Sequence, residues 1–258
     1  MPDLGAVVAC GEYLNENSAG GRCWYYKGGS VWAHLPDSTD SHCPQATIDA
    51  VADQGWWIMG FEQTEGDTTC TEDWNSELFT GTDWVPGPAH PPNGFPGYYC
   101  VATLNDTHSL LTGGYLTWTD SWLYNWEADD LTETAPLNQG RTFHGCAALE
   151  GRGALVAGGT FTDGNGTFNV TSVEFFDSAT ERWSLEPALG LFDRAAGTTL
   201  LTADQTVLAL LPGSDQVFQL DRDFYWTPLQ GVRLPAPFNG YSWTKAVLVP
   251  DNFALGCI

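Results

Sequence analysis

Apolar stretches that end in a pair of glycines recur along this chain. Gly153–Phe161 reads GALVAGGTF, and His108–Leu116, one repeat earlier, reads HSLLTGGYL. A strand that ends in a glycine pair and returns at a period of about 50 residues is typical of repeated β architectures. The pattern therefore predicts an all-β protein assembled from similar sheets.

The rest of each repeat can be read around these glycine pairs. A second strand with paired aromatic residues follows, then a tryptophan, a proline-rich stretch and a third apolar run. The clearest copy has SVEFFD at Ser172–Asp177, then Trp183, then GTTLLTA at Gly197–Ala203. Further aromatic strands are expected at Arg22–Lys27, Ser76–Gly81, Ser121–Trp126 and Asp215–Asp221. Four short strands per repeat, separated by turn residues, predict propeller blades.

This pattern resembles the kelch repeat, which has a strand-terminal Gly-Gly, an aromatic residue in the third strand and a later tryptophan. The resemblance extends over nearly the whole chain and is clearest in residues 98–200. It implies one domain, residues 1–258, folded as a kelch-like β-propeller of four-stranded antiparallel blades. Kelch repeats imply no single activity, so the function must come from the site residues.

The blade count depends on how the two ends are interpreted. Phe253–Ile258 (FALGCI) reads as the start of another glycine-terminated strand. We therefore expect about five blades plus a truncated sixth, in a fragment of a longer chain of six or seven blades. The alternative is five blades, closed by Thr244–Pro250 pairing beside Gly5–Tyr13.

The glycine pairs and the tryptophans are expected to be structural. Gly113, Gly114, Gly158 and Gly159 would let the backbone turn and approach its neighbour closely. The repeated tryptophans would wedge between neighbouring blades, where their large apolar surface is buried.

Charge narrows the range of partners. The chain has 32 acidic against 9 basic residues and a formal net charge of −23. Such a surface repels phosphate backbones and anionic lipid headgroups, so we expect neither nucleic-acid binding nor binding to a membrane surface. No apolar stretch reaches the length of a spanning helix, so membrane insertion is not expected either.

Cysteines and glycosylation motifs favour the secretory pathway or an extracellular location. Of seven cysteines, Cys10 and Cys23 lie at facing ends of consecutive strands and are predicted to form a disulfide. The spacings contain no CxxC and no Cys/His cluster, so no metal site is expected. Three N-x-Thr sequons fall in predicted loops or at a loop edge, at Asn105, Asn165 and Asn169.

Motifs for chemistry are incomplete. Asp163–Glu174 has part of a calcium-loop pattern and part of a sialidase-type Asp box, but Phe168 stands where a calcium loop requires glycine, so a plain hairpin loop is expected. An enzyme of the galactose oxidase type would need two histidines, two tyrosines and a cysteine. Tyr98, Tyr99 and Cys100 are available, but the five histidines occupy different repeat positions. We therefore expect no enzyme activity and no cofactor, with the galactose oxidase type kept as an alternative.

A binding surface is the remaining hypothesis. In kelch-like propellers, loops from successive blades share one face, and here they would carry Tyr98, Tyr99, Trp118, Arg141, His144, Arg194 and Tyr241. Arginine and aromatic residues are the types that anchor interfaces. We expect an extracellular, non-enzymatic module that binds a protein, or alternatively a glycan, through this face. A second interpretation is that each arginine pairs with a loop carboxylate between blades.

Overall fold

A computed structural model describes the chain at residues 6–11, 22–26, 33–34, 36, 47–51, 55–63, 70–80, 82–87, 99–115, 118–187, 198–203, 206–211, 214, 216–221, 224–233 and 245–249. For the strands before Ser76, the end of β21 and all of β22, only the backbone is described. The chain divides into two compact units, residues 1–97 with 243–258, and residues 98–242.

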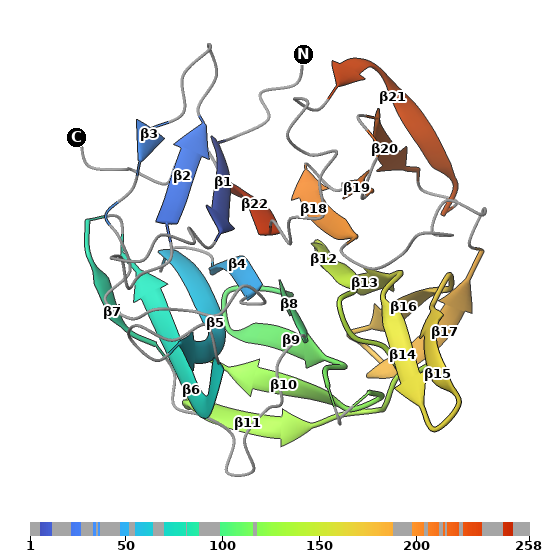
Figure 1. The fold of residues 1–258 in the computed structure, drawn as a ribbon, viewed down its shortest axis with the longest axis horizontal. Coiled ribbons are helices and arrows are strands. Elements are labelled where there is room, and N and C mark those ends of the chain that lie inside the picture. The colour runs from blue at the N-terminus through green and yellow to red at the C-terminus, as the bar shows by residue number, and fades with distance from the viewer. Residues whose placement is uncertain are drawn as a thin grey trace. The chain divides into compact units, whose positions relative to one another are not determined.

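The described residues form strands and no helices, as the sequence pattern predicts, so no membrane-spanning helix is found among them. Five sheets have four antiparallel strands each, and a sixth sheet is a two-stranded hairpin (Figure 1). The expected four-stranded antiparallel repeat is confirmed.

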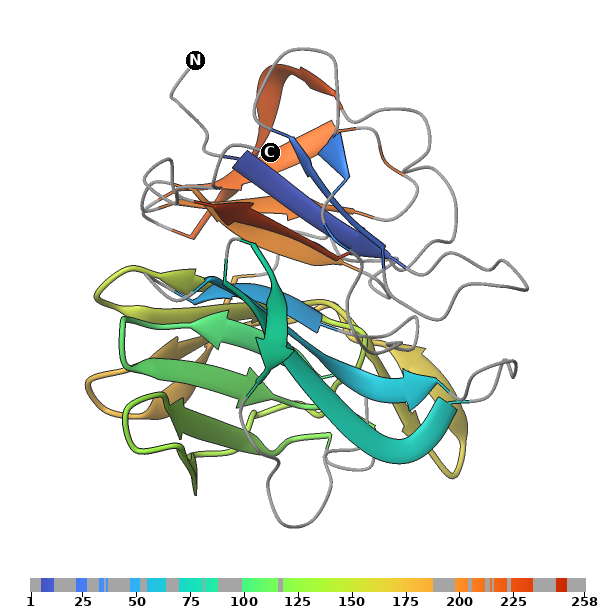
Figure 2. The ribbon, with the colours of Figure 1, turned by 90° about the vertical axis from the view of Figure 1, so that its left-hand side faces the viewer.

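The first unit holds two of these sheets. One has the order β22-β1-β2-β3 and the other β4-β5-β6-β7. Figure 2 shows the curvature of the long β5–β6 pair, whose register shifts between Phe61 and Gln63. The strands are β1 (Ala6–Gly11), β2 (Arg22–Tyr26), β3 (Ala33–His34), β4 (Thr47–Val51), β5 (Gly55–Gln63), β6 (Cys70–Phe79), β7 (Trp84–Pro86) and β22 (Lys245–Val249).

The C-terminal strand β22 completes the N-terminal sheet. It pairs antiparallel with β1, so that Ala6 lies opposite Val249 and Cys10 opposite Lys245. This is the pairing of Thr244–Pro250 beside Gly5–Tyr13 that the five-blade alternative requires. Residues 253–258, in which a truncated sixth blade was expected to begin, lie outside the described residues.

The second unit holds three four-stranded sheets and the hairpin. The sheets have the orders β8-β9-β10-β11, β12-β13-β16-β17 and β18-β19-β20-β21, and β14 pairs with β15. The strands are β8 (Cys100–Thr103), β9 (His108–Thr112), β10 (Ser121–Asn125), β11 (Asp130–Glu133), β12 (Gly145–Leu149), β13 (Gly153–Ala157), β14 (Thr160–Asp163), β15 (Gly166–Asn169), β16 (Val173–Asp177), β17 (Arg182–Glu186), β18 (Thr199–Ala203), β19 (Thr206–Leu210), β20 (Gln216–Leu220) and β21 (Trp226–Arg233). We call the sheet of β12, β13, β16 and β17 the middle sheet.

Strand β13 of the middle sheet is buried on both faces. Successive residues of β13 point to opposite sides, and Ala154 and Val156 join Leu110 of the β8–β11 sheet in one apolar cluster. Leu155 and Ala157 join a second cluster with residues of the β18–β21 sheet, such as Leu200 and Val207. Burial on both faces explains why β13 reads as a continuous apolar run.

Two tryptophans at equivalent positions of different repeats make equivalent contacts. Trp84 of β7 packs on Phe79 at 5.1 Å between ring centroids, and Trp183 of β17 packs on Phe176 at 5.2 Å. Trp84 Nε1 donates a hydrogen bond to the carbonyl oxygen of Pro36 at 2.8 Å, and Trp183 Nε1 to that of Ala135 at 2.9 Å, each 48 residues upstream. Each tryptophan therefore joins its own repeat to the preceding one, as expected.

The glycine pairs have the predicted conformational role. Gly113, Gly114, Gly158 and Gly159 all have positive φ angles, of 65°, 107°, 72° and 95°. A Cβ added at Gly113 would lie 2.5 Å from the carbonyl oxygen of Arg141, and one at Gly159 would lie 2.5 Å from that of Thr142. Only glycine permits both the left-handed backbone and this close approach.

The structure places the predicted cysteine pair and adds a disulfide that was not predicted. Cys10 of β1 lies directly opposite Cys23 of β2, as the spacing predicts, but their side chains lie outside the described residues. A disulfide that the sequence did not assign joins Cys100 of β8 to Cys146 of β12. Both cysteines lie in the first strand of their sheet, nearly one repeat apart, and this equivalence is the signal that could have identified the pair.

Candidate functional site

The predicted loop face divides into buried, partly exposed and undescribed residues. Arg141, His144 and Tyr99 are buried, and Trp118 is partly exposed. Tyr98, Arg194 and Tyr241 lie outside the described residues. Trp118 is therefore the one described member of the predicted set that is open to a partner.

Arg141 is the largest fully buried side chain of the described residues. Its Nη2 lies 2.6 Å from Glu174 Oε1 and also donates to Ser172 Oγ at 2.8 Å. Its Nη1 donates to the carbonyl oxygens of Gly158 and Ser172, at 3.1 and 3.0 Å. With 0% exposure, this guanidinium offers no surface to a partner; it pairs with a carboxylate, as the second interpretation proposed, although Glu174 lies in strand β16 rather than in a loop.

Glu174 holds the other side of this network. Its Oε2 accepts from the backbone N and the Nδ2 of Asn138, and its Oε1 accepts from the backbone N of Gln139. Burial lowers the pKa of Arg141 below its ordinary value, and the charge of Glu174 opposes that change. The pair therefore fixes residues 138–141 on the middle sheet through a fully bonded buried ion pair.

His144 fills the space between the two glycine pairs. Its Nε2 lies 2.9 Å from Oγ1 of Thr112, the last residue of β9, which directly precedes Gly113. A Cβ at Gly113 would meet its Cε1 at 2.8 Å, and a Cβ at Gly159 would meet its own Cβ at 2.9 Å. The predicted partner contact is therefore a packed internal side chain.

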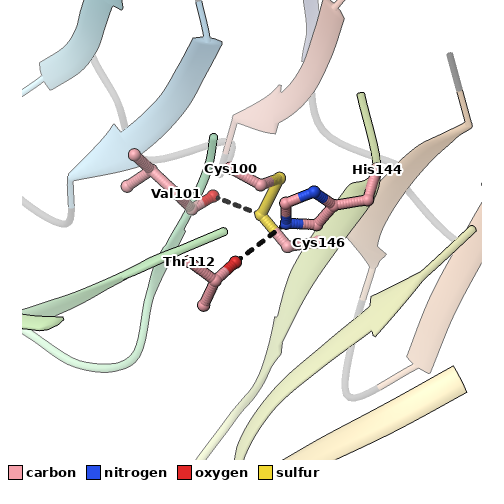
Figure 3. The surroundings of a disulfide bond; sticks show 5 residues. All are labelled: Cys100, Val101, Thr112, His144 and Cys146. Atoms are coloured by element: carbon pink, nitrogen blue, oxygen red, sulfur yellow. Dashed lines mark hydrogen bonds between the residues drawn. A yellow bond between two sulfur atoms is a disulfide. The ribbon is translucent and has the colours of Figure 1, made fainter. Parts of the chain in front are cut away.

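Figure 3 shows His144 beside the Cys100–Cys146 disulfide. The sulfur of Cys146 lies 2.9 Å from the carbonyl oxygen of Val101. A disulfide sulfur has no proton to donate, so this is a close contact and not a hydrogen bond. Tyr99, next to Cys100, is also buried, and desolvation raises the pKa of its phenol well above the ordinary value. These groups stabilise the junction of β8 and β12.

The segment held by Arg141 positions two surface loops through its backbone. Arg141 N donates to the carbonyl oxygen of Trp118 at 2.8 Å, and Gly114 N donates to that of Arg141 at 3.0 Å. The next residue, Thr142, exchanges two backbone hydrogen bonds of 2.8 Å with Thr160 at the start of β14. The buried arginine therefore anchors both the β9–β10 loop and the β14–β15 hairpin.

Three aromatic side chains of these two loops are in ring contact, and a fourth shares a face of the hairpin with one of them. The Tyr115 and Trp118 rings are 5.7 Å apart, the Trp118 and Phe161 rings 5.3 Å apart, and both pairs meet edge to face. Phe168 lies directly opposite Phe161 in the hairpin, so the two side chains share one face of it. We call Tyr115, Trp118, Phe161 and Phe168 the aromatic row.

The outer members of the aromatic row are open to solvent. Tyr115 is 47% and Phe168 50% exposed. Beneath the centre of the row, a Cβ at Gly140 would lie 2.8 Å from the Trp118 Cβ and 3.1 Å from the Phe161 ring, so the rings pack directly on the backbone. Tyr115, Phe161 and Phe168 were not predicted as site residues, although Tyr115 and Phe161 lie one and two residues after a glycine pair.

One carboxylate shares the hairpin face of the aromatic row, and another follows Trp118 closely in the sequence. Asp163 is exposed and lies two residues beyond Phe161, on the same face of the hairpin. Asp120 lies two residues beyond Trp118; burial and, to a lesser extent, the charge of Glu133 raise its pKa. Within the described part of the chain, Asp120, Glu133 and Asp163 form no ion pair with a basic side chain.

The segment that begins at Asp163 forms the plain hairpin that the sequence predicts. Asp163–Asn169 contains its turn, in which Asp163 Oδ1 accepts from Asn165 N at 2.7 Å, so the expected plain hairpin is confirmed. Among the described residues, no group of three or more His, Cys, Asp or Glu side chains could hold a metal ion. The sequon asparagines Asn105, Asn165 and Asn169 are all exposed.

Comparison with known proteins adds support for the fold. No protein-family model and no curated protein matches the sequence. The chain is similar to a solved structure described as "Structure of YjhT", with a TM-score of 0.56 and 18% sequence identity, covering 78% of this chain and 69% of that one. At this identity the similarity concerns the fold alone, and it agrees with the repeated four-stranded sheets described above.

Proposed function

We propose that the chain is an extracellular, non-enzymatic binding module, built as a kelch-type β-propeller, that contacts a protein partner through the aromatic row. The propeller is supported by five four-stranded antiparallel sheets at the expected repeat positions. It is also supported by the two tryptophan hydrogen bonds that reach back 48 residues. The extracellular location is supported by the Cys100–Cys146 disulfide and by the exposed sequons.

The observation that carries the binding function is the half-exposed aromatic row on a rigid base. Aromatic side chains are enriched at the centres of interfaces because they bury a large area at a low cost in conformational entropy. Here Trp118 is fixed by the hydrogen bond from Arg141 N, and β14 by the pair between Thr142 and Thr160. Little ordering of these loops is then needed when a partner binds.

The test is a selection from a random peptide-display library on the purified chain. Peptides enriched by the wild type should bind the double variant Tyr115→Ala/Phe168→Ala at least tenfold more weakly, or by about 1.4 kcal/mol. Tyr225→Ala is the matched control, because Tyr225 is also 50% exposed but lies before β21, outside the row. It should leave binding unchanged.

Two results would count against the proposal. Selected peptides that bind the double variant as tightly as the wild type would place the partner elsewhere. If no peptide is selected while a glycan array shows binding that Tyr115→Ala/Phe168→Ala abolishes, the partner is a glycan instead of a protein.

A further inference from the structure

If the proposed function holds, the chemistry of the aromatic row indicates which side chains of a partner it would bind. Its ring faces carry negative potential, and arginine and lysine are the side chains attracted to such faces. The outer rings, Tyr115 and Phe168, are half exposed and so present surface to a ligand.

The charge around the row favours the same ligand. Asp163 shares the hairpin face of Phe161 and Phe168. Asp120 follows Trp118 closely and lies near enough to Glu133 for that charge to raise its pKa. A cation bound near these carboxylates would reduce the repulsion between Asp120 and Glu133, whereas an anionic ligand would increase the repulsion. The formal net charge of −23 acts in the same direction at longer range.

The protein already holds one arginine between two aromatic rings. The guanidinium of Arg152, in the β12–β13 turn, lies 5.4 Å from the ring centroid of Phe175 and 5.3 Å from that of Phe224. Phe175 and Phe224 are themselves 5.5 Å apart and meet edge to face. The neighbouring rings of the row have the same edge-to-face geometry at 5.3 and 5.7 Å.

We propose that the aromatic row, with Asp163 on the same hairpin face and Asp120 two residues after Trp118, binds an arginine or lysine side chain of an extended basic segment of the partner protein. The aromatic faces receive the cation and its apolar stem, and the two carboxylates supply the opposite charge. Because the row lies on two loops that Arg141 anchors, the site is formed before the partner arrives.

The experiment uses the full chain and four labelled peptides of the same Gly/Ser sequence, with two arginines, two lysines, two citrullines or two glutamates. Citrulline has nearly the shape of arginine but no charge. The arginine peptide should bind at least tenfold more tightly than the citrulline peptide, in a fluorescence polarisation titration. The glutamate peptide should not bind, and binding should weaken with added salt.

Matched variants distinguish binding at the aromatic row from nonspecific attraction of a basic peptide to an acidic protein. Tyr115→Ala/Phe168→Ala keeps every charge, so it should lose at least tenfold in affinity for the arginine peptide only if the rings bind it. Asp120→Asn and Asp163→Asn should each weaken binding several-fold. Glu127→Gln removes the same charge from the β10–β11 turn, at the opposite end of β10 from Asp120, and should have little effect.

The outcomes distinguish this inference from the proposed function. If citrulline and arginine peptides bind equally, or if Tyr115→Ala/Phe168→Ala binds the arginine peptide like the wild type, the cation site is wrong. The proposed function would still stand if display-selected peptides without basic residues depend on Tyr115 and Phe168. It would fall if no peptide or protein ligand depends on the aromatic row.

Discussion

At the scale of single residues, Arg141 illustrates how a functional signal in the sequence can have a structural origin. The sequence suggested a role in partner binding because the chain has only nine basic residues and because Arg141 and Arg194 occupy matching repeat positions. In the structure Arg141 instead neutralises the buried carboxylate of Glu174. Arg141 supports the binding surface from below instead of forming it.

Removing Arg141 should destabilise the protein strongly. Arg141→Met leaves Glu174 buried without its cation, and breaking a buried pair in this way costs about 3–5 kcal/mol. The free energy of unfolding, measured by urea denaturation, should fall by that amount. The double variant Arg141→Met/Glu174→Met should recover a substantial part of it, since no charge is then left unpaired. A loss below about 1 kcal/mol for the single variant would show that the pair is not buried in solution.

Gly113 and Gly151 offer a matched test of close approach. Both have φ near 65°, so alanine at either position pays the left-handed strain of about 1–2 kcal/mol. At Gly113 the new Cβ would also lie 2.5 Å from the Arg141 carbonyl oxygen, whereas nothing lies within 4 Å at Gly151. Gly113→Ala should therefore lower the melting temperature clearly more than Gly151→Ala. Equal shifts would mean that only the backbone angle matters.

Asp120 should make stability depend on pH. Burial first, and then the charge of Glu133, raise its pKa in the folded state above that of the unfolded chain. The ionised carboxyl therefore opposes folding at neutral pH, and this cost disappears as the pH falls through the folded pKa. Asp120→Asn should raise the melting temperature at neutral pH, by an amount that shrinks in acidic buffer. A gain that is the same at every pH, or that Glu127→Gln reproduces, would contradict this explanation.

At the scale of elements, the strands followed from the sequence more reliably than the contacts between them. The expected strands at Ser172–Asp177 and Gly197–Ala203 correspond to β16 and β18, because alternation and glycine pairs act locally. The burial of Arg141, which lies between β11 and β12, depends on Glu174 of β16, 33 residues away, and no local pattern encodes that contact. The aromatic row likewise forms only when two loops of different repeats are brought together.

The Cys100–Cys146 disulfide should be a main constraint on the second unit, because it joins the first strands of two neighbouring sheets. Because the cysteines are 46 positions apart in the sequence, loss of the cross-link should lower the free energy of unfolding by about 4 kcal/mol on a chain-entropy estimate. Cys100→Ala, Cys146→Ala and the double variant should lose nearly the same amount in denaturant titrations without reductant. Additive losses would instead indicate that each side chain acts through its packing.

At the scale of the whole chain, the described pairing agrees with the five-blade alternative, since β22 completes the sheet of β1, β2 and β3. The sequence alone left this choice open because the apolar runs at Lys245–Val249 and Phe253–Ile258 both read as strands. Strand pairing between the two ends of a chain is a long-range property. The local sequence of a run therefore does not determine which strand it pairs with.

Deleting residues 243–258 should therefore expose that edge. Ala6–Cys10 would lose the five register partners that β22 supplies, and unpaired strand edges promote association with other chains. We expect a lower melting temperature and concentration-dependent oligomers in size-exclusion chromatography with light scattering. A chain that lacks only residues 251–258 keeps β22 and should behave like the full chain. If the longer deletion is equally stable and monomeric, β22 is dispensable and the pairing of the two ends does not hold the first unit together.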